Sequence, residues 1–163
     1  HRPDHVAQIQ REIREGHTLA NHSYSHKIKA VYQSADSCIK EIRDQQKWLT
    51  ETVGVTPEIY RFPGGSPTAG NKKQAIAAAL AADGLGYVDW NCATGDGLPG
   101  VLTTEKAYQN AVSSVGEQKI VVMLMHDYSA ATLEALPDII DTLKAKGYMM
   151  MPLFRESVMI RSA

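Results

Sequence analysis

The sequence has little of what marks the most easily recognised classes of protein. Its two cysteines, Cys38 and Cys92, are too few for a disulfide framework, and a bond between them is the less favoured arrangement. No stretch approaches about 18 consecutive apolar residues, so no transmembrane helix is predicted. The formal net charge of −1 gives no reason to expect nucleic acid or an anionic membrane as a partner. The 163 residues, 44% of them hydrophobic, instead fit one globular domain that spans residues 1–163.

Strand-like and helix-like segments alternate along the chain, which is typical of a parallel sheet with crossover helices. Strands are expected at residues 17–21, 59–62, 87–90, 119–125 and 148–152. Helices are expected around residues 9–13 and at 35–49, 71–83, 104–115 and 136–146. The sequence therefore predicts an α/β fold.

Particular residue types mark the ends of these helices. Ser34 can cap the N-terminus of the second helix. Gly16, Gly84 and Gly147 each follow a predicted helix and fit the left-handed position after its C-terminus. Pro137 fits the first turn of the last helix, where its missing N–H costs nothing.

Two further groups of residues are interpreted as structural. The methionines from Met149 to Met151 lie on the last predicted strand and are expected to fill the core. The charged residues between Glu41 and Glu51 are expected to form a solvated outer face of a helix. Neither group is given a function.

The residues that suggest chemistry begin with two histidines, His22 and His26, four positions apart in a short polar segment. If this segment forms one helical turn, both rings project from one face and can reach one ion at about 2.0–2.1 Å. Two histidines do not complete a catalytic zinc site, which takes three protein ligands. On spacing alone, a polar turn with two surface histidines fits as well.

Three more segments lie at the ends of predicted strands: Arg61 to Gly65, Tyr87 to Trp90, and Leu124 to Asp127. Taken in order with the histidine pair, they resemble the motifs of the polysaccharide deacetylases of the NodB-homology type, which are metal-dependent carbohydrate esterases. The likeness covers nearly the whole chain. It implies a distorted (β/α) barrel, whose functional sites lie at the C-terminal ends of the strands, where all four motifs are expected.

The resemblance implies roles for the histidines. His22 and His26 would hold a divalent metal, with zinc first and cobalt, nickel or manganese as alternatives. His126 would be the general acid, because histidine can be charged near neutral pH. Asp89 would stabilise its imidazolium, since a nearby negative charge favours the charged form. Asp127 is the competing partner and is otherwise expected to be structural or to face solvent.

The resemblance also assigns the surroundings of the reacting group. Arg61 would orient the catalytic carboxylate of the family and, without that carboxylate, should turn to solvent or to Asp89. The backbone N–H of Gly64 would be an oxyanion donor. Trp90 and Leu124 would form the apolar pocket for the acetyl methyl group, although an ordinary core role fits Trp90 equally well. A fourth acid, Asp96, is interpreted as a turn residue.

One part of the family pattern is absent. The family carries Thr-Phe-Asp-Asp-Gly-Pro on its first strand, which supplies a catalytic base and the third metal ligand, whereas no Asp-Asp pair occurs in these 163 residues. We therefore expect the barrel to lack its N-terminal strands here and a companion segment to carry Asp-Asp. On this expectation the chain alone has little or no turnover.

The expected function is metal-dependent hydrolysis of the N-acetyl group of N-acetylglucosamine residues in peptidoglycan, with chitin-type oligomers next. One alternative is a carbohydrate-binding or scaffold protein that has lost catalysis. Another is an assembly in which a second chain supplies the missing strands, and a third is acetyl ester hydrolysis on a polysaccharide such as xylan. The resemblance alone places the protein outside the cell or in the cell envelope.

Overall fold

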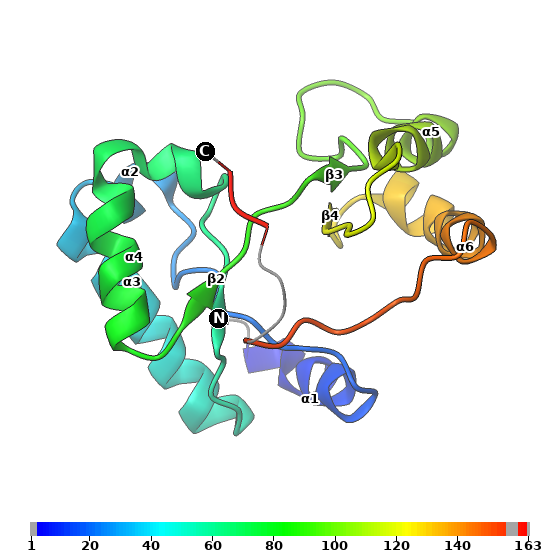
Figure 1. The fold of residues 1–163 in the computed structure, drawn as a ribbon. Helices are drawn as coiled ribbons and strands as arrows, with labels where there is room; N and C mark the ends of the chain where they lie inside the picture. Colours follow the sequence, from blue (N-terminus) through cyan, green and yellow to red (C-terminus); the bar gives the residue numbers. More distant parts are fainter. Residues whose placement is uncertain (1–2, 156–159, 163) are drawn as a thin grey trace. The chain divides into compact units, whose positions relative to one another are not determined.

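A computed structural model describes residues 3–155 and 160–162 of the chain (Figure 1). It contains two units: His1–Asp89 with Pro152–Ala163 form unit 1, and Trp90–Met151 form unit 2. Both units combine helices with short parallel strands, so the predicted α/β class is confirmed. None of the helices in the described part of the chain has both the length and the apolar character needed to cross a membrane. That residues 1–163 form a single domain stays a prediction.

Unit 1 contains two paired strands and the larger set of helices. Its elements are η1 (Pro3–His5), α1 (Val6–Arg14), α2 (Ile28–Val31), α3 (Ala35–Trp48), the π-helical turn η2 (Leu49–Val53), β1 (Ile59–Tyr60), η3 (Ser66–Lys72), α4 (Lys73–Ala82) and β2 (Gly86–Tyr87). β1 and β2 run parallel, with Tyr60 opposite Tyr87. Asn21 adds an isolated parallel bridge to Tyr60. Because carboxyl ends of parallel strands share one edge, His22 and Arg61 emerge at the same edge.

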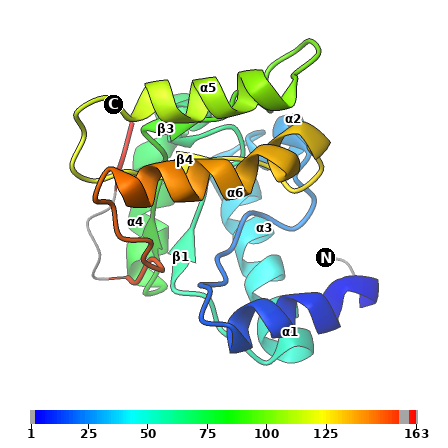
Figure 2. The same ribbon diagram turned by 90° about the vertical axis from the view of Figure 1, so that its right-hand side faces the viewer.

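Unit 2 repeats this arrangement on a smaller scale. Its elements are β3 (Cys92–Ala93), α5 (Thr104–Val115), β4 (Met123–Leu124) and α6 (Ala130–Ala145). β3 and β4 are parallel, with Ala93 opposite Leu124. α5 and α6 lie side by side (Figure 2). Residues that follow β3 and β4, among them Asp96 and His126, therefore leave the same edge of this sheet.

The strands are shorter than the sequence predicts. The described residues form four strands of two residues each, and the expected strand at 17–21 is reduced to the bridge at Asn21. No strand forms at residues 148–152, because in the described structure this segment has no neighbouring strand to pair with. Met149, Met150 and Met151 are 83%, 46% and 69% exposed, so the prediction that they fill the core is wrong. The distorted barrel stays a prediction.

Most helix ends lie where the local residues place them. The side chain of Ser34 accepts a hydrogen bond from Ser37 N at 3.0 Å, as an N-cap does. Gly16, Gly84 and Gly147 have positive φ angles of 91°, 80° and 91° just after their helices. These predictions are confirmed.

The start of the last helix differs from the prediction. α6 begins at Ala130, because Ser129 caps it by accepting a hydrogen bond from Thr132 N at 3.2 Å. Pro137 therefore lies inside the helix and not in its first turn. The serine cap, and not the proline, sets where α6 begins. The longer helix includes Thr132, which contacts Asp96 after β3.

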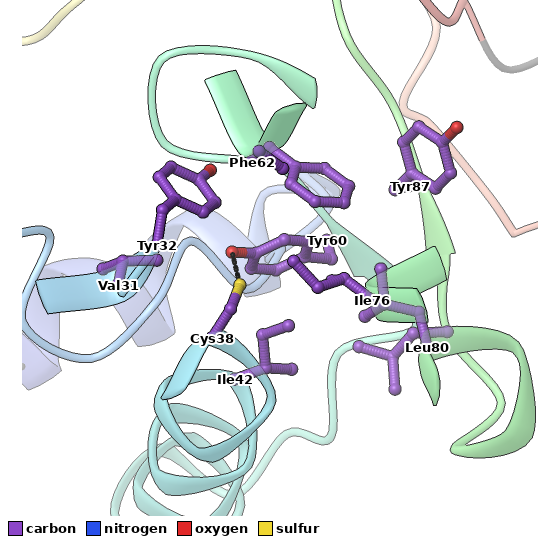
Figure 3. Close-up of a cluster of buried hydrophobic side chains, with 11 residues drawn as sticks. Val31, Tyr32, Cys38, Ile42, Tyr60, Phe62, Ile76, Leu80 and Tyr87 are labelled. Carbon is purple, nitrogen blue, oxygen red and sulfur yellow. Dashed lines mark hydrogen bonds between the residues drawn. The ribbon is translucent and has the colours of Figure 1, made fainter. Parts of the chain in front are cut away.

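The core of unit 1 is built around aromatic rings (Figure 3). The ring of Phe62 meets those of Tyr60 and Tyr87 edge to face, with centroids 5.0 and 5.1 Å apart. The thiol of Cys38 lies 3.7 Å from the Tyr60 hydroxyl. Burial raises the pKa of both the Tyr60 hydroxyl and the Cys38 thiol, so both stay neutral.

The core of unit 2 lies between α5 and α6. Small and aliphatic side chains of the two helices interlock there: Ala107, Ala111, Val115, Ala135, Ile139 and Leu143. Cys92 of β3 packs against the same cluster, and both Cys38 and Cys92 are free thiols. The small alanine side chains let α5 and α6 pack against each other, and α5 also packs against β3.

Truncation of Phe62 tests the aromatic core. Because this ring is fully buried between two tyrosines, Phe62→Ala should lower the free energy of unfolding by about 3–5 kcal/mol. Urea unfolding followed by circular dichroism measures the loss. The matched control is Phe154→Ala, at a ring that is 55% exposed. Equal losses from the two variants would contradict the role given to the core.

Candidate functional site

The two histidines lie in a loop that leaves the edge of unit 1 directly after Asn21. The loop is not helical: Ser23 and His26 have positive φ angles of 68° and 55°. The segment therefore does not form the helical turn that would place both rings on one face. The rings meet nevertheless, with His22 Nε2 and His26 Nε2 3.2 Å apart on the exposed side of the loop.

Side-chain hydrogen bonds stabilise this left-handed loop. Asn21 Oδ1 accepts from Ser23 N at 3.1 Å, and Ser23 Oγ accepts from His26 N at 3.1 Å. Such turns offset the cost of a left-handed conformation in residues other than glycine. Asn21 is fully buried and donates from Nδ2 to the Ile42 carbonyl of α3 at 2.8 Å. The loop is therefore fastened to a helix that lies next to it.

The geometry of the histidine pair fits two ligand positions of one metal ion. His22 Nδ1 lies 2.7 Å from the carbonyl oxygen of Arg61, which can only accept, so Nδ1 carries the proton and Nε2 the lone pair. Two nitrogens bound to a tetrahedral zinc at about 2.0–2.1 Å would be about 3.3–3.4 Å apart. The observed separation of 3.2 Å is close to this value.

A third ligand is not found in the described structure. Among the residues described, no group of three His, Cys, Asp or Glu side chains is placed to hold a metal ion. A catalytic zinc site takes three protein ligands and leaves one position for water. The pair therefore supplies part of such a site.

Asp89 and Arg61 lie after β2 and β1 of the same unit. The carboxylate of Asp89 is fully buried and accepts from Ser66 N, Ser66 Oγ and Ser162 N at 2.8, 2.6 and 2.9 Å. Burial lowers the pKa of the Arg61 guanidinium, and the negative charge of Asp89 opposes this shift. Asp89 thus organises the backbone that follows Gly65 and balances the charge of Arg61.

Gly64 stands where only glycine fits. Its φ angle is 73°, and a Cβ there would lie 3.0 Å from Thr68 Oγ1, which donates to the Gly64 carbonyl at 2.7 Å. The residue is exposed at the start of the turn that leads into η3. Its role as an oxyanion donor stays a prediction.

His126, two residues after β4, is held by Asp96. His126 Nδ1 lies 2.8 Å from Asp96 Oδ1, and the backbone N–H of His126 donates to Asp96 Oδ2 at 2.7 Å. Thr132 Oγ1 donates to the same Oδ2 at 2.8 Å. The side chain of Asp96 is 2% exposed and that of His126 is 32% exposed. A carboxylate can only accept, so His126 Nδ1 carries a proton and Nε2 is the nitrogen available for chemistry.

The partner assigned to His126 from the sequence therefore needs correction. The structure pairs His126 with Asp96, whereas Asp89 binds Ser66 and Ser162, and Asp127 is exposed. Asp96 was interpreted as a turn residue. The signal that could have identified it is its position after β3, the parallel neighbour of the strand that ends before His126.

Neighbouring residues hold both the Asp96 carboxylate and the His126 imidazole in place. Burial by itself would raise the pKa of Asp96, but the hydrogen bonds from His126 and Thr132 outweigh burial and hold it below its ordinary value. The ring of Tyr128 stacks on the imidazole with centroids 4.9 Å apart. On Gly97, a Cβ would lie 3.0 Å from His126 Cε1. The imidazole is thus packed tightly as well as hydrogen-bonded.

Trp90 and Leu124 both belong to unit 2. Trp90 is partly buried and lines a surface groove together with Cys92 of β3, Asn110 of α5 and Leu98 of the segment between these elements. Leu124 lies on β4 and is not one of the described residues that line this groove. Their shared role as an acetyl pocket stays a prediction.

Glu41 was missed by the sequence analysis. Its Oε2 accepts hydrogen bonds from the backbone N–H groups of Tyr24 and Ser25 at 3.0 and 2.7 Å. The interpretation of Glu41 as part of a solvated helix face is therefore wrong. No spacing rule could have found it, because the contact joins two segments that only the packing of α3 brings together.

The chain belongs to the polysaccharide deacetylase family, whose model matches residues 2–85. Its structure is similar to the catalytic domain of peptidoglycan N-acetylglucosamine deacetylase from Eubacterium rectale, with a TM-score of 0.90 and 32% identity over 99% of this chain and 76% of that one. It is 26% identical to a peptidoglycan-N-acetylglucosamine deacetylase of Bacillus cereus, over 91% of this chain and 55% of the relative. It is 32% identical to a chitin deacetylase of Colletotrichum lindemuthianum, over 86% and 56%. The chain spans about half the length of these curated relatives.

Replacement of Asp96 by asparagine tests its electrostatic role. A carboxylate whose pKa is lowered in the folded state stabilises the fold above its unfolded pKa of about 3.9, and this contribution is lost as the pH falls through the folded pKa. Asp96→Asn should therefore be less stable than the unchanged protein near pH 7, and the difference should shrink below about pH 4.

Urea unfolding at a series of pH values measures this difference. Asp127→Asn is the matched control, because that neighbouring side chain is exposed and its replacement should change stability little. A loss from Asp96→Asn that is the same at every pH would show that the carboxylate charge does not matter.

Proposed function

We propose that this chain contributes most of the site of an enzyme that removes acetyl groups, with a divalent metal, from N-acetylglucosamine residues of a polysaccharide, with peptidoglycan as the first choice and chitin-type oligomers next. The observation that carries the proposal is the histidine pair, with its Nε2 atoms 3.2 Å apart and His22 Nδ1 held by the Arg61 carbonyl. Membership of the polysaccharide deacetylase family supports the chemistry. The names of the similar Eubacterium rectale and Bacillus cereus proteins support the order of substrates. Such a substrate would place the activity outside the cell or in its envelope.

His22 and His26 would hold a divalent metal, zinc first, which when bound supplies Lewis acidity and lowers the pKa of a bound water. The fixed tautomer of His22 presents Nε2 without any rearrangement of the ring. Cobalt, nickel or manganese suit the same ligand types. In this proposal the third ligand and the catalytic base come from the Asp-Asp motif of the family, which these 163 residues do not contain.

His126 would act as the general acid. Its Nδ1–H donates to Asp96, so Nε2 is the nitrogen that would pass a proton to the leaving amine. Asp96 orients the ring and stabilises the imidazolium form, and Thr132 holds Asp96 in place. The backbone N–H of Gly64 would stabilise the oxyanion, Arg61 would orient the catalytic carboxylate, and Trp90 and Leu124 would contact the acetyl methyl group.

A carbohydrate-binding protein without catalysis is the second candidate. The observation that favours it is the lack of a third metal ligand among the described residues. Binding of acetylated chito-oligosaccharide without release of acetate would support this candidate. Hydrolysis of acetyl esters on a polysaccharide such as xylan would be a variant of the first proposal.

Acetate release from acetylated chito-oligosaccharide, measured with added zinc or cobalt, tests the proposal. In the complete enzyme, with the Asp-Asp segment present, His126→Ala should lower kcat by about 10²–10⁴-fold and leave the metal content unchanged, because it removes a proton donor. His22→Ala should lower the metal content itself. His17→Ala, at an exposed histidine outside the motifs, is the control for both.

Two measurements separate the metal-ligand role of His22 from the general-acid role of His126. Atomic absorption gives the metal content, and detection of released acetate gives kcat. Loss of metal from His126→Ala with retention by His22→Ala would mean that the roles are misassigned. An unchanged kcat in both variants would contradict the proposed mechanism.

A further inference from the structure

The loop that carries His22 and His26, here called the histidine loop (residues 22–27), has backbone N–H groups that donate to side-chain oxygens. Five consecutive amides, from Ser23 to Lys27, donate to Asn21 Oδ1, Glu41 Oε2 (twice), Ser23 Oγ and Ser25 Oγ. A helix would satisfy such groups with its own carbonyls, but this loop cannot. Its conformation therefore depends on these side chains.

Glu41 differs from the other acceptors because it belongs to a different element. Asn21, Ser23 and Ser25 are part of the loop or directly precede it, whereas Glu41 lies on α3, 17 residues from Tyr24 and 16 from Ser25. One carboxylate oxygen of Glu41 accepts hydrogen bonds from both the Tyr24 and the Ser25 amides, at 3.0 and 2.7 Å. Hydrogen bonds to an ionised acceptor are stronger than those between neutral groups. Glu41 therefore ties the middle of the loop to the helical framework.

The tie lies between the two histidines. Tyr24 and Ser25 lie, with Ser23, between His22 and His26 in the sequence, and His22 Nδ1 is itself held by the Arg61 carbonyl. Without the tie, the loop could open and the Nε2 atoms would separate, since His26 has a strained left-handed backbone. Ordering the loop again would then oppose metal binding.

We propose that Glu41 is a positioning residue for the metal ligands, whose carboxylate holds the loop so that His22 Nε2 and His26 Nε2 stay in place to share one ion. This inference rests on the metal-binding part of the proposed function and not on the substrate. The proposed positioning role requires that the Glu41 side chain is long enough to contact the Tyr24 and Ser25 amides and that it ends in an acceptor oxygen. The negative charge is a secondary requirement.

Three substitutions separate reach from charge. Glu41→Ala removes the acceptor, Glu41→Asp keeps the charge but withdraws it by one methylene, and Glu41→Gln keeps the reach and an acceptor oxygen without the charge. Asp44→Ala is the matched control, because Asp44 lies on the same helix and pairs at the surface with Lys40 at 2.5 Å. His22→Ala defines the signal that is lost when a ligand is removed.

Cobalt(II) titration of the full chain, followed by visible absorption, measures metal affinity without any assay of activity. We expect Glu41→Ala and Glu41→Asp to bind cobalt about tenfold or more weakly, in the range seen when groups that support metal ligands are removed. Glu41→Gln and Asp44→Ala should bind within about threefold of the unchanged protein. Circular dichroism at the titration temperature shows that each variant is folded.

Hydrogen exchange in the metal-free protein gives a second readout. The Tyr24 and Ser25 amides should exchange faster in Glu41→Asp than in Glu41→Gln, because only the longer side chain reaches them. This comparison tests whether the length of the Glu41 side chain holds the loop, even if Glu41→Ala does not fold.

Unchanged cobalt affinity in folded Glu41→Ala or Glu41→Asp would overturn the inference and leave the proposed function standing. Equal weakening in Glu41→Gln and Glu41→Asp would overturn it too, because reach and an acceptor oxygen would then not be enough to hold the two ligands in place. If the unchanged protein and His22→Ala bind cobalt equally, the metal-binding part of the proposed function fails, and the inference fails with it.

Discussion

Parallel pairing of very short strands is the constraint on which the arrangement of the candidate residues in each unit depends. In unit 1, the bridge between Asn21 and Tyr60 and the pairing of β1 with β2 bring the segments of His22 and Arg61 to one edge. In unit 2, the pairing of β3 with β4 does the same for Asp96 and His126. Two residues per strand are enough because the helices and aromatic rings on the faces carry most of the burial. The strands thus contribute alignment more than stability.

Carboxylates that accept several hydrogen bonds organise the loops at these edges. Asp89 accepts hydrogen bonds from Ser66 and Ser162. Asp96 accepts them from His126 and Thr132. Glu41 accepts them from two backbone amides of the histidine loop. Loops that leave a sheet have N–H groups that no strand or helix satisfies, and an unpaired buried amide is costly. A single ionised oxygen can satisfy two of them at once. The same contacts that complete the fold therefore position the groups that carry chemistry.

Local sequence signals predicted the helices well and the strands poorly. The cap at Ser34 and the glycines after α1, α4 and α6 act on residues a few positions away, so their effect can be read directly. The strand at 148–152 depends on a partner elsewhere in the chain, and without one in the described structure Met149 to Met151 are exposed. The early start of α6 shows two local signals in competition, in which the Ser129 cap prevailed over Pro137. That outcome matters, because it brings Thr132 to Asp96.

The sequence by itself determined the order of the motifs, the α/β class and the pairing of His22 with His26, because these depend on residue type and short spacing. It also singled out His126 as a residue that ends a strand. Only the tertiary structure decided that Asp96 rather than Asp89 holds His126, and that Glu41 supports the histidine loop. These contacts join residues 16 to 30 positions apart. Which carboxylate reaches which loop depends on strand register and helix packing, and neither is encoded in the neighbouring residues alone.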